Sequence, residues 1–259
     1  MKKIKPWKIV FVFLALVIFL FIFIPLLRMV FSANPKLISS ALRDKEIVAS
    51  ILLSLKMALF STVFALFTGI PLAYIFARGH FPLKSFFEAV IDIPVMIPHT
   101  AAGIALLSVF GSRFLLGKIF GFFGIKFVGT EFGIAIGMMF VSLSYLVNQV
   151  KNGFRKIDVK LENVARSLGA NERQVFFRIS LPLVRREILS GSIMMWARGI
   201  SEFGAVVILA YHPMTAPVLI LERFNSFGLQ YAKPVAVVLV LVCILIFTIL
   251  RWISNKRGN

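Results

Sequence analysis

Residues 157–182 read IDVKLENVARSLGANERQVFFRISLP, and this stretch decides how the rest of the chain is interpreted. In its first half, apolar residues recur at helical spacing with charged residues between them, which predicts a short amphipathic helix. Gly169 follows at the position of a left-handed C-terminal cap. Asn171 and Gln174 have the spacing of a capping box for a second short helix, which Pro182 then interrupts.

This helix–glycine–helix module has two possible surroundings. Its first helix can lie on a lipid surface, or it can plug into a cytosolic partner protein. The apolar side chains available for either contact are Leu161, Val164, Ala165 and Leu168. The charged residues between the apolar positions are Asp158, Lys160, Glu162 and Arg166.

The composition places this module beside a membrane. Of the 259 residues, 59% are hydrophobic and only 15% are charged. Soluble domains contain about 45–50% apolar and about 25% charged residues, so a water-soluble globule, a coiled coil and a disordered chain are all excluded. The net charge of +18 does not indicate nucleic-acid binding, which needs a polar, solvated scaffold. We therefore expect an all-α, polytopic membrane protein.

Six apolar runs are long enough to cross a bilayer, for which a helix needs about 20 residues. The first run is too long for the apolar part of a signal peptide and is expected to be retained. Six spans would place both termini on the same side of the membrane. The runs cover residues 7–31, 50–77, 86–110, 130–150, 191–211 and 234–252.

The basic residues indicate which side that is. Eighteen Lys and Arg residues fall with the termini, the short connection near Gly79 and the loop 151–190, whereas 10 fall on the opposite side. The richer side is normally cytoplasmic. We expect a plasma-membrane protein with cytoplasmic termini. Residues 1–49 then hold a cytoplasmic tail, the first span and an external loop, residues 50–252 form the core, and residues 253–259 are a cytoplasmic tail.

Two of the predicted spans carry unusual residues. Pro94 and Pro98 each remove a backbone donor from the third span, which predicts a kinked or locally unwound helix. Arg198 and Glu202 lie four residues apart in the fifth span, on one face of the helix. They either line a path for an anion or form an ion pair that holds helices together. The candidate path also includes Pro94, Pro98 and His99, and the alternative for His99 is a simply packed side chain.

No sequence pattern indicates catalysis or a bound metal. The single Cys243 and the scattered His80, His99 and His212 give no metal-ligand spacing, and no phosphate-binding loop of the G-x-x-x-x-G-K-S/T type occurs. We therefore expect a chain that is not an enzyme and binds no cofactor itself. An ion-coupled secondary transporter would need two matched broken helices, and only one run is clearly broken by prolines.

The loop resembles a family motif. Permease subunits of bacterial and archaeal ABC importers carry the pattern E-A-A-x3-G-x9-I-x-L-P, and five of its seven fixed positions are present here. Asn163 and Val164 depart from the pattern, although Glu162 is adjacent. The matching residues are Ala165, Gly169, Ile179, Leu181 and Pro182. The resemblance implies that residues 151–190 couple the chain to an ATPase subunit through Leu161, Glu162, Asn163, Val164, Ala165, Gly169, Ile179, Leu181 and Pro182.

Two further stretches resemble the molybdate and tungstate importers. They are DIPVMIPHTAAGIALL at residues 92–107 and WARGISEFGA at residues 196–205, and sulfate permeases share a looser version of the second. The resemblance implies a type I importer permease of the MetI-like fold, working as a homodimer. Its implied partners are two cytosolic ATPase subunits, which use ATP and Mg²⁺, and an extracellular oxyanion-binding protein. The sequence does not distinguish tungstate, molybdate and sulfate as the cargo.

Overall fold

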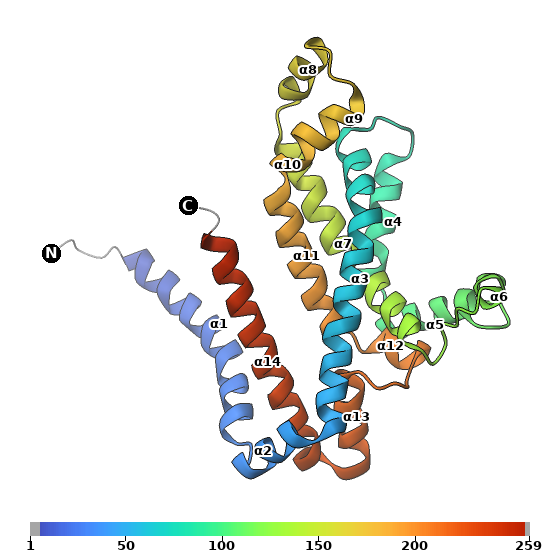
Figure 1. Cartoon of the computed structure of the whole chain (residues 1–259). Coiled ribbons are helices and arrows are strands. Elements are labelled where there is room, and N and C mark those ends of the chain that lie inside the picture. The colour runs from blue at the N-terminus through green and yellow to red at the C-terminus, as the bar shows by residue number, and fades with distance from the viewer. Residues whose placement is uncertain (1–5, 257–259) are drawn as a thin grey trace. The chain divides into compact units, whose positions relative to one another are not determined.

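The computed structural model describes residues 6–256, and every regular element in that range is a helix (Figure 1). Two compact units are present, one formed by Met1–Val48 with Leu219–Asn259 and the other by Ala49–Val218. The elements in chain order are α1 (Pro6–Phe31), α2 (Pro35–Arg43), α3 (Lys45–Arg78), α4 (Lys84–Met96), α5 (His99–Phe110), α6 (Leu115–Phe122), α7 (Glu131–Lys156), α8 (Val159–Ser167), α9 (Glu172–Val175), the π-helix η1 (Phe176–Ser180), α10 (Leu181–Leu183), α11 (Arg185–Ile200), α12 (Gly204–Leu209), α13 (Ala216–Phe227) and α14 (Leu229–Lys256).

Four helices are long and apolar enough to cross a bilayer: α1, α3, α7 and α14. They coincide with the first, second, fourth and sixth predicted apolar runs, and these helix predictions are confirmed. Helix α14 continues to Lys256, four residues past the predicted end of the last span. Of the predicted cytoplasmic tails, residues 1–5 and 257–259 lie outside the described part of the chain.

The third predicted run is a bent pair of helices. Helices α4 and α5 meet at an angle of 113°, so the pair is either a broken span or a re-entrant loop. The break falls at Ile97, which is extended (φ −81°, ψ 153°) and precedes Pro98. A residue before proline is driven out of the helical region, and proline has no N–H to continue the ladder. The predicted kink is therefore confirmed, and the bend follows from Pro98.

The fifth predicted run is also broken, so its expectation as one continuous helix from 191 to 211 is wrong. Helix α11 ends at Ile200, and α12 begins only at Gly204. The Glu202 side chain accepts a hydrogen bond from the Ala205 backbone N–H at 2.9 Å, at the start of the new helix. Six continuous spans are thus not found among the described residues, which contain four long helices and the bent α4–α5 pair.

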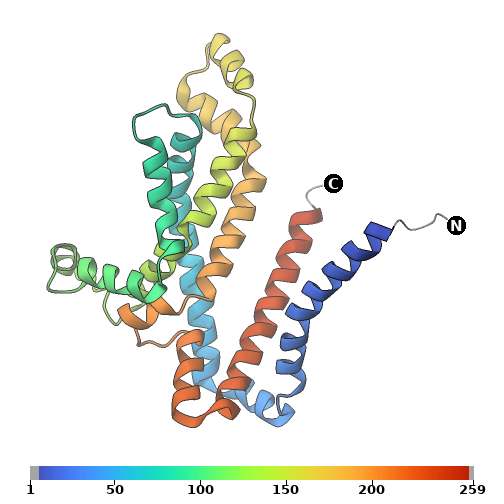
Figure 2. The same cartoon turned by 180° about the vertical axis from the view of Figure 1, so that it is seen from behind.

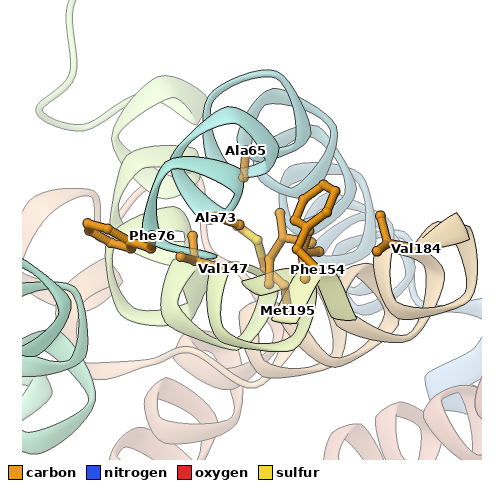
Figure 3. Close-up of a cluster of buried hydrophobic side chains, with 9 residues drawn as sticks. Ala65, Ala73, Phe76, Val147, Phe154, Val184 and Met195 are labelled. Atoms are coloured by element: carbon orange, nitrogen blue, oxygen red, sulfur yellow. The ribbon is translucent and has the colours of Figure 1, made fainter. Parts of the chain in front are cut away.

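The core of the second unit lies between α3, α7 and α11 (Figure 3). Small side chains on these helices allow close approach, as at Gly191, where an added Cβ would lie 3.1 Å from Gln149 of α7. Close backbone packing of this kind holds membrane helices together, because lipid offers no hydrophobic driving force between them. The buried residues are Ala65, Ala73, Phe76, Leu146, Val147, Val150, Phe154, Val184 and Met195.

Helices α5 and α12 also pack closely. An added Cβ at Gly103 would lie 2.8 Å from the Ile208 side chain and 3.0 Å from the Ala205 backbone. A Cβ added at Gly137 of α7 would lie 3.5 Å from the Val206 side chain. Small residues after Pro98 and in α7 thus let these helices approach closely.

The other unit contains α1, α2 and α14. Helix α2 lies within the predicted external loop and is capped by Asn34, whose side chain accepts from the Lys36 backbone N–H at 3.0 Å. Arg223 forms ion pairs with Asp44 at 3.4 Å and with Glu46. These contacts join the end of α2 and the start of α3 to α13, an arrangement that the apolar runs did not predict.

Candidate functional site

Helix α8 begins and ends where its sequence signals predict. Asp158 is the N-cap, and its carboxylate accepts from the Lys160 backbone N–H at 2.9 Å. At the other end, Gly169 takes φ +92°, the left-handed conformation that glycine adopts without strain. The Gly169 N–H donates to Arg166 at 2.9 Å, and the Ala170 N–H donates to Ala165 at 3.0 Å. This is a Schellman motif, so the predicted glycine cap is confirmed.

The predicted capping box is also present. Asn171 accepts from the Gln174 backbone N–H, and the Gln174 side chain accepts from the Asn171 N–H, both at 2.9 Å. Helix α9 then widens into the π-helix η1, in which the Leu181 N–H bonds to Phe176 five residues earlier. Figures 1 and 2 show α8 and α9 at one end of the paired helices α7 and α11.

Pro182 does not interrupt the chain as predicted. The helix continues through it to Leu183, and the break falls at Val184 (φ −96°, ψ 9°). In a regular α-helix, proline would lack one hydrogen bond and clash with the carbonyl four residues before it. In the wider π-turn immediately before Pro182, backbone N–H groups bond to carbonyls five residues earlier instead of four. This change lets the proline lie inside the helical segment.

Glu162 is fully buried, although it falls between the apolar positions of α8 in the sequence. Both of its carboxylate oxygens lie 3.1 Å from Nε of Arg78, at the end of α3. The Ser180 hydroxyl donates to the same carboxylate at 2.8 Å. A second nitrogen of Arg78 donates to the Ile157 carbonyl at 3.1 Å. Arg78 therefore anchors α8 at two points, the Glu162 carboxylate and the Ile157 carbonyl between α7 and α8.

An aromatic cluster fixes the same region. The Tyr74 ring packs edge-on against Phe154 at 5.1 Å and against Phe176 at 4.9 Å between centroids. Edge-to-face ring pairs add roughly 0.5–1.5 kcal/mol to their area burial. The rings come from α3, α7 and η1, and Val175 beside them is fully buried. The loop is therefore a packed extension of the helix bundle.

The opposite face of α8 is uncovered. Leu161, Val164 and Leu168 are exposed, and Leu168 is 83% accessible. Apolar side chains aligned at helical spacing and without a contact on this chain are typical of a face that docks into a groove. Of the other predicted coupling residues, Asn163 and Pro182 are also exposed, whereas Ala165, Ile179 and Leu181 are half-buried.

Charged residues surround the uncovered face. Arg166 donates to the Glu172 carboxylate at 2.8 Å and 3.2 Å, and this hydrogen bond lowers the pKa of Glu172 below its usual value. The pair therefore stays ionised at neutral pH, across the glycine bend. Next to it lies a cavity of about 420 Å³ lined by Asn171, Arg173, Gln174, Phe177 and Arg178.

The predicted intramembrane pair is present and includes a third residue. Arg198 Nη2 lies 2.9 Å from Oε2 of the buried Glu202, and His99 Nδ1 lies 2.8 Å from the same oxygen. A carboxylate only accepts hydrogen bonds, so the Arg198 and His99 nitrogens are the donors. With His99 Nδ1 donating to Glu202, the 2.7 Å approach of Arg198 Nη2 to that same nitrogen brings two donors together. The three side chains join α5 to the α11–α12 break.

Two other acids of the third run also bind α7. The Asp92 carboxylate accepts from the Asn148 amide at 2.6 Å. Glu88 pairs with Lys151 at 2.9 Å and with Arg155 at 2.8 Å. These contacts hold α4 against α7 at the end of the bundle that carries α8. Pro94 is half-buried inside α4, and Pro98 is exposed at the bend. Neither proline is hydrogen-bonded to Arg198 or Glu202.

Comparison with known proteins identifies related chains. A family model described as "Binding-protein-dependent transport system inner membrane component" matches residues 69–258. The molybdate/tungstate transport system permease protein WtpB of Methanocaldococcus jannaschii is 42% identical over 243 residues, covering 93% of this chain and 94% of the relative. A probable sulfate transport system permease protein of Chlorokybus atmophyticus is 28% identical, covering 96% of this chain and 88% of the relative.

Solved structures share the fold at low sequence identity. A bacterial alginate ABC transporter, solved in complex with an alginate-bound periplasmic protein, matches 97% of this chain and 95% of its own with a TM-score of 0.75 and 14% identity. The methionine ABC transporter MetNI, in inward-facing form, matches 81% of this chain and 95% of its own with a TM-score of 0.65 and 17% identity. At these identities the likeness shows the fold alone.

Proposed function

The chain belongs to the inner-membrane components of binding-protein-dependent transport systems, and we propose that it is the membrane permease of an ATP-driven importer of molybdate or tungstate. It is a multi-pass membrane protein with the fold of type I importer permeases. Permease subunits of this class are not enzymes, and ATP hydrolysis belongs to separate partner subunits.

The choice of cargo rests on the difference in sequence identity between two kinds of relative. The molybdate/tungstate permease is 42% identical to this chain, whereas the sulfate permease is 28% identical over a similar share of it. Sulfate, molybdate and tungstate are all tetrahedral dianions, so sulfate is the second candidate. An extracellular binding protein would make most of the selection, and this chain would supply the pathway.

The exposed face of α8 supports the coupling proposal. An uncovered apolar helix held rigidly on the bundle by Arg78 and Glu162 can sit in a groove of an ATPase subunit. Closure of that subunit on ATP and Mg²⁺ would then push α8, and the ion pair would pass the movement to α3 as a rigid-body step. Two permease copies and two ATPase subunits would complete the transporter, with both termini of each permease in the cytoplasm.

The intramembrane cluster of His99, Arg198 and Glu202 has two candidate roles. Arg198 and His99 are partly accessible, with 20% and 32% of their side chains exposed, which supports the predicted path through Arg198, Glu202, Pro94, Pro98 and His99. Against this, Glu202 neutralises Arg198 directly, and a paired cation leaves little field to attract a dianion. The contacts support more strongly a role in holding α5 to the α11–α12 break.

The test of cargo is uptake by the complete transporter in liposomes. The permease, its ATPase and its binding protein would be assembled together with ATP inside the vesicles, and accumulated molybdenum, tungsten and sulfur would be measured by elemental mass spectrometry. We expect molybdate and tungstate to accumulate and to compete with each other more strongly than sulfate does. Equal accumulation of sulfate would favour the second candidate. Uptake driven by an ion gradient, without ATP, would overturn the importer class itself.

A further inference from the structure

A cavity of about 300 Å³ opens on the unit Ala49–Val218, between α4, α7 and α11. Most of the side chains around it are polar, although α7 is one of the four helices that are long and apolar enough to cross a bilayer. The polar lining residues are Asp92, Ser144, Tyr145, Asn148, Gln149 and Asn152. Polar groups at this place in a membrane helix need a reason, because hydrocarbon offers them no hydrogen bonds.

Five of the polar residues form a stripe on one face of α7. They occupy two adjacent rows with i, i+4 spacing: Ser144, Asn148 and Asn152 in one row, and Tyr145 and Gln149 in the other. Asp92 lies opposite the stripe on α4, where its carboxylate accepts a hydrogen bond from the Asn148 amide at 2.6 Å. The stripe begins near the middle of α7 and runs toward the end that leads into α8.

Most of the stripe has no partner on this chain. Among the described residues, none provides a side-chain hydrogen bond to Ser144, Tyr145, Gln149 or Asn152. The Tyr145 and Gln149 side chains are half-buried, and Asn152 is exposed. Unsatisfied polar groups are costly against lipid tails. Water, or polar groups from outside the chain, must therefore cover this face.

The surroundings of Asp92 favour water. The Asn148 amide is its one side-chain partner among the described residues, and no cation is part of the cavity lining. A carboxylate without a cation is stable at this depth only where water hydrates it. A second copy packed on the same face would bring amides and another carboxylate but no opposite charge, so a water-filled cavity fits the lining better.

The cavity lies between the two charged groups already described. Met194 belongs to its lining and precedes Arg198 by one turn on the same face of α11, so the cavity extends toward the intramembrane cluster. One turn from Asp92 in the other direction along α4, Glu88 pairs with two cations of α7, which leaves this group with one net positive charge. Polar surface thus continues from the middle of the bundle to the end that carries α8.

We propose that this cavity is a segment of the anion's route, through which the hydrated dianion passes toward the α8 end of the bundle. The inference rests on the proposed function and assigns the route to residues of α7. Amide and hydroxyl groups can replace part of the hydration shell of a tetrahedral oxyanion by donating hydrogen bonds to it. Asp92 repels a dianion, so the anion passes through and is not retained.

The volume is sufficient for this role. One water takes about 30 Å³ of liquid volume, so the cavity has room for a tetrahedral oxyanion together with several waters. A bare dianion would need cations to replace its hydration, and the lining supplies none. The anion therefore passes with water around it.

The first experiment tests whether water reaches the stripe. Cys243 is the one cysteine of the sequence, so Cys243→Ser gives a background without thiols. In that background, Tyr145→Cys and Asn152→Cys would be placed singly in the complete transporter in lipid nanodiscs and treated with the anionic reagent sulfonatoethyl methanethiosulfonate. We expect both thiols to react at least about tenfold faster than thiols that face lipid, because the reactive thiolate forms readily only in a hydrated site.

Matched control sites are available on α3. Phe67 and Ile75 are exposed apolar residues, which lie eleven and three residues before the end of α3. Tyr145 and Asn152 lie eleven and four residues before the end of α7. The two helix ends are level, since Arg78 donates to the carbonyl directly after α7 at 3.1 Å. Equal labelling of the stripe and the controls Phe67→Cys and Ile75→Cys would overturn the proposal, as would disulfide cross-linking between copies at Tyr145→Cys without labelling.

The second experiment tests whether the cargo passes the stripe. Gln149→Glu adds a negative charge with little change of shape, and Gln149→Met is the neutral control of similar size. A unit charge about 6 Å from a dianion in water lowers the local concentration of the dianion about tenfold. We expect ATP-driven molybdate uptake by the reconstituted transporter to fall about tenfold in Gln149→Glu and much less in Gln149→Met, with equal co-purification of the ATPase.

Equal uptake by the two Gln149 variants would overturn the route. If either variant failed to assemble, Asn152→Asp and Asn152→Ser, at an exposed position of the same stripe, would make the same comparison. Failure of the wild type to take up molybdate would count against the proposed function alone, because labelling of the stripe and the same comparison with sulfate would still test the route.

Discussion

Arg78 and Glu162 are 84 residues apart in the sequence, yet Nε of Arg78 lies 3.1 Å from both oxygens of the Glu162 carboxylate. The pair connects the end of α3 to the middle of α8. The Glu162 side chain is 1% exposed and that of Arg78 is 15% exposed, so the attraction is only weakly screened by water. Ser180 adds a hydrogen bond to the same carboxylate from the other side of the loop.

Replacing Arg78 should therefore both destabilise and uncouple the transporter. Arg78→Met leaves a buried, unpaired carboxylate, and breaking a buried pair in this way costs roughly 3–5 kcal/mol. We expect a lower midpoint of thermal unfolding for the purified permease. In the complete transporter, ATP hydrolysis should respond less to the loaded binding protein, because α8 is no longer tied rigidly to α3. Calorimetry and phosphate release measure the two effects.

The control for this variant is Arg185→Met, which removes an exposed arginine at the start of α11. Its stability should stay within about 0.5 kcal/mol of the wild type, as for most surface changes. The double variant Arg78→Met with Glu162→Gln should recover part of the lost stability, since no charge is left buried alone. Equal costs for the single and double variants would show that the pair does not anchor α8.

Gly169 should tolerate asparagine but not valine. Its φ of +92° lies in the left-handed region, where a residue with a branched Cβ is strained by at least about 1–2 kcal/mol. An added Cβ meets nothing within 4 Å, so the cost comes from the backbone and not from a clash. We expect Gly169→Val to uncouple ATP hydrolysis from uptake and Gly169→Asn to retain coupling. Identical coupling in both variants would remove the glycine bend from the mechanism.

The exposed face of α8 should be needed for assembly with the ATPase. Leu168→Asp places a charge on the apolar face without disturbing the fold, because the side chain is 83% exposed. We expect the ATPase to co-purify with the permease several-fold less. Val159→Asp is the matched control, since Val159 is an exposed apolar residue on the opposite side of the same helix. Loss of assembly in both variants would show that added negative charge anywhere on the loop weakens assembly, and the apolar face would not be the docking surface.

Local signals in the sequence were sufficient for the caps and the bend. The conformation of Gly169 and the box formed by Asn171 and Gln174 depend on residues only a few positions apart, so their chemistry decides the outcome. The same holds for the break before Pro98, where proline restricts the preceding residue. The four long apolar helices could likewise be predicted, because their hydrophobicity needs no partner to be recognised.

Contacts between distant segments could not be predicted in the same way. Glu162 follows the polar spacing of α8, and only the fold brings Arg78 and Ser180 to it. The end of α11 gave no local warning, since no proline lies near Ile200. That break is stabilised by tertiary packing: Gly204 lies so close to His99 that an added Cβ would approach it to 2.7 Å, and Glu202 turns back to cap α12.

Arg198 and Glu202 allow the two proposed roles of their cluster to be separated. Arg198→Met leaves Glu202 buried without its main cation. His99 is then its one remaining side-chain donor among the described residues. We expect the loss of stability to be severe, roughly 3–5 kcal/mol. Glu202→Gln should cost less, because the amide oxygen can still accept from the Ala205 N–H that begins α12.

The combined variant, Arg198→Met with Glu202→Gln, is the informative one, because it removes both charges and keeps the cap on α12. If the cluster mainly holds α5 to the α11–α12 break, this variant should be more stable than Arg198→Met alone and should still transport molybdate. Uptake by the reconstituted transporter, measured beside the unfolding midpoint, decides the matter. A combined variant that folds normally but no longer transports would place these residues in the path of the anion.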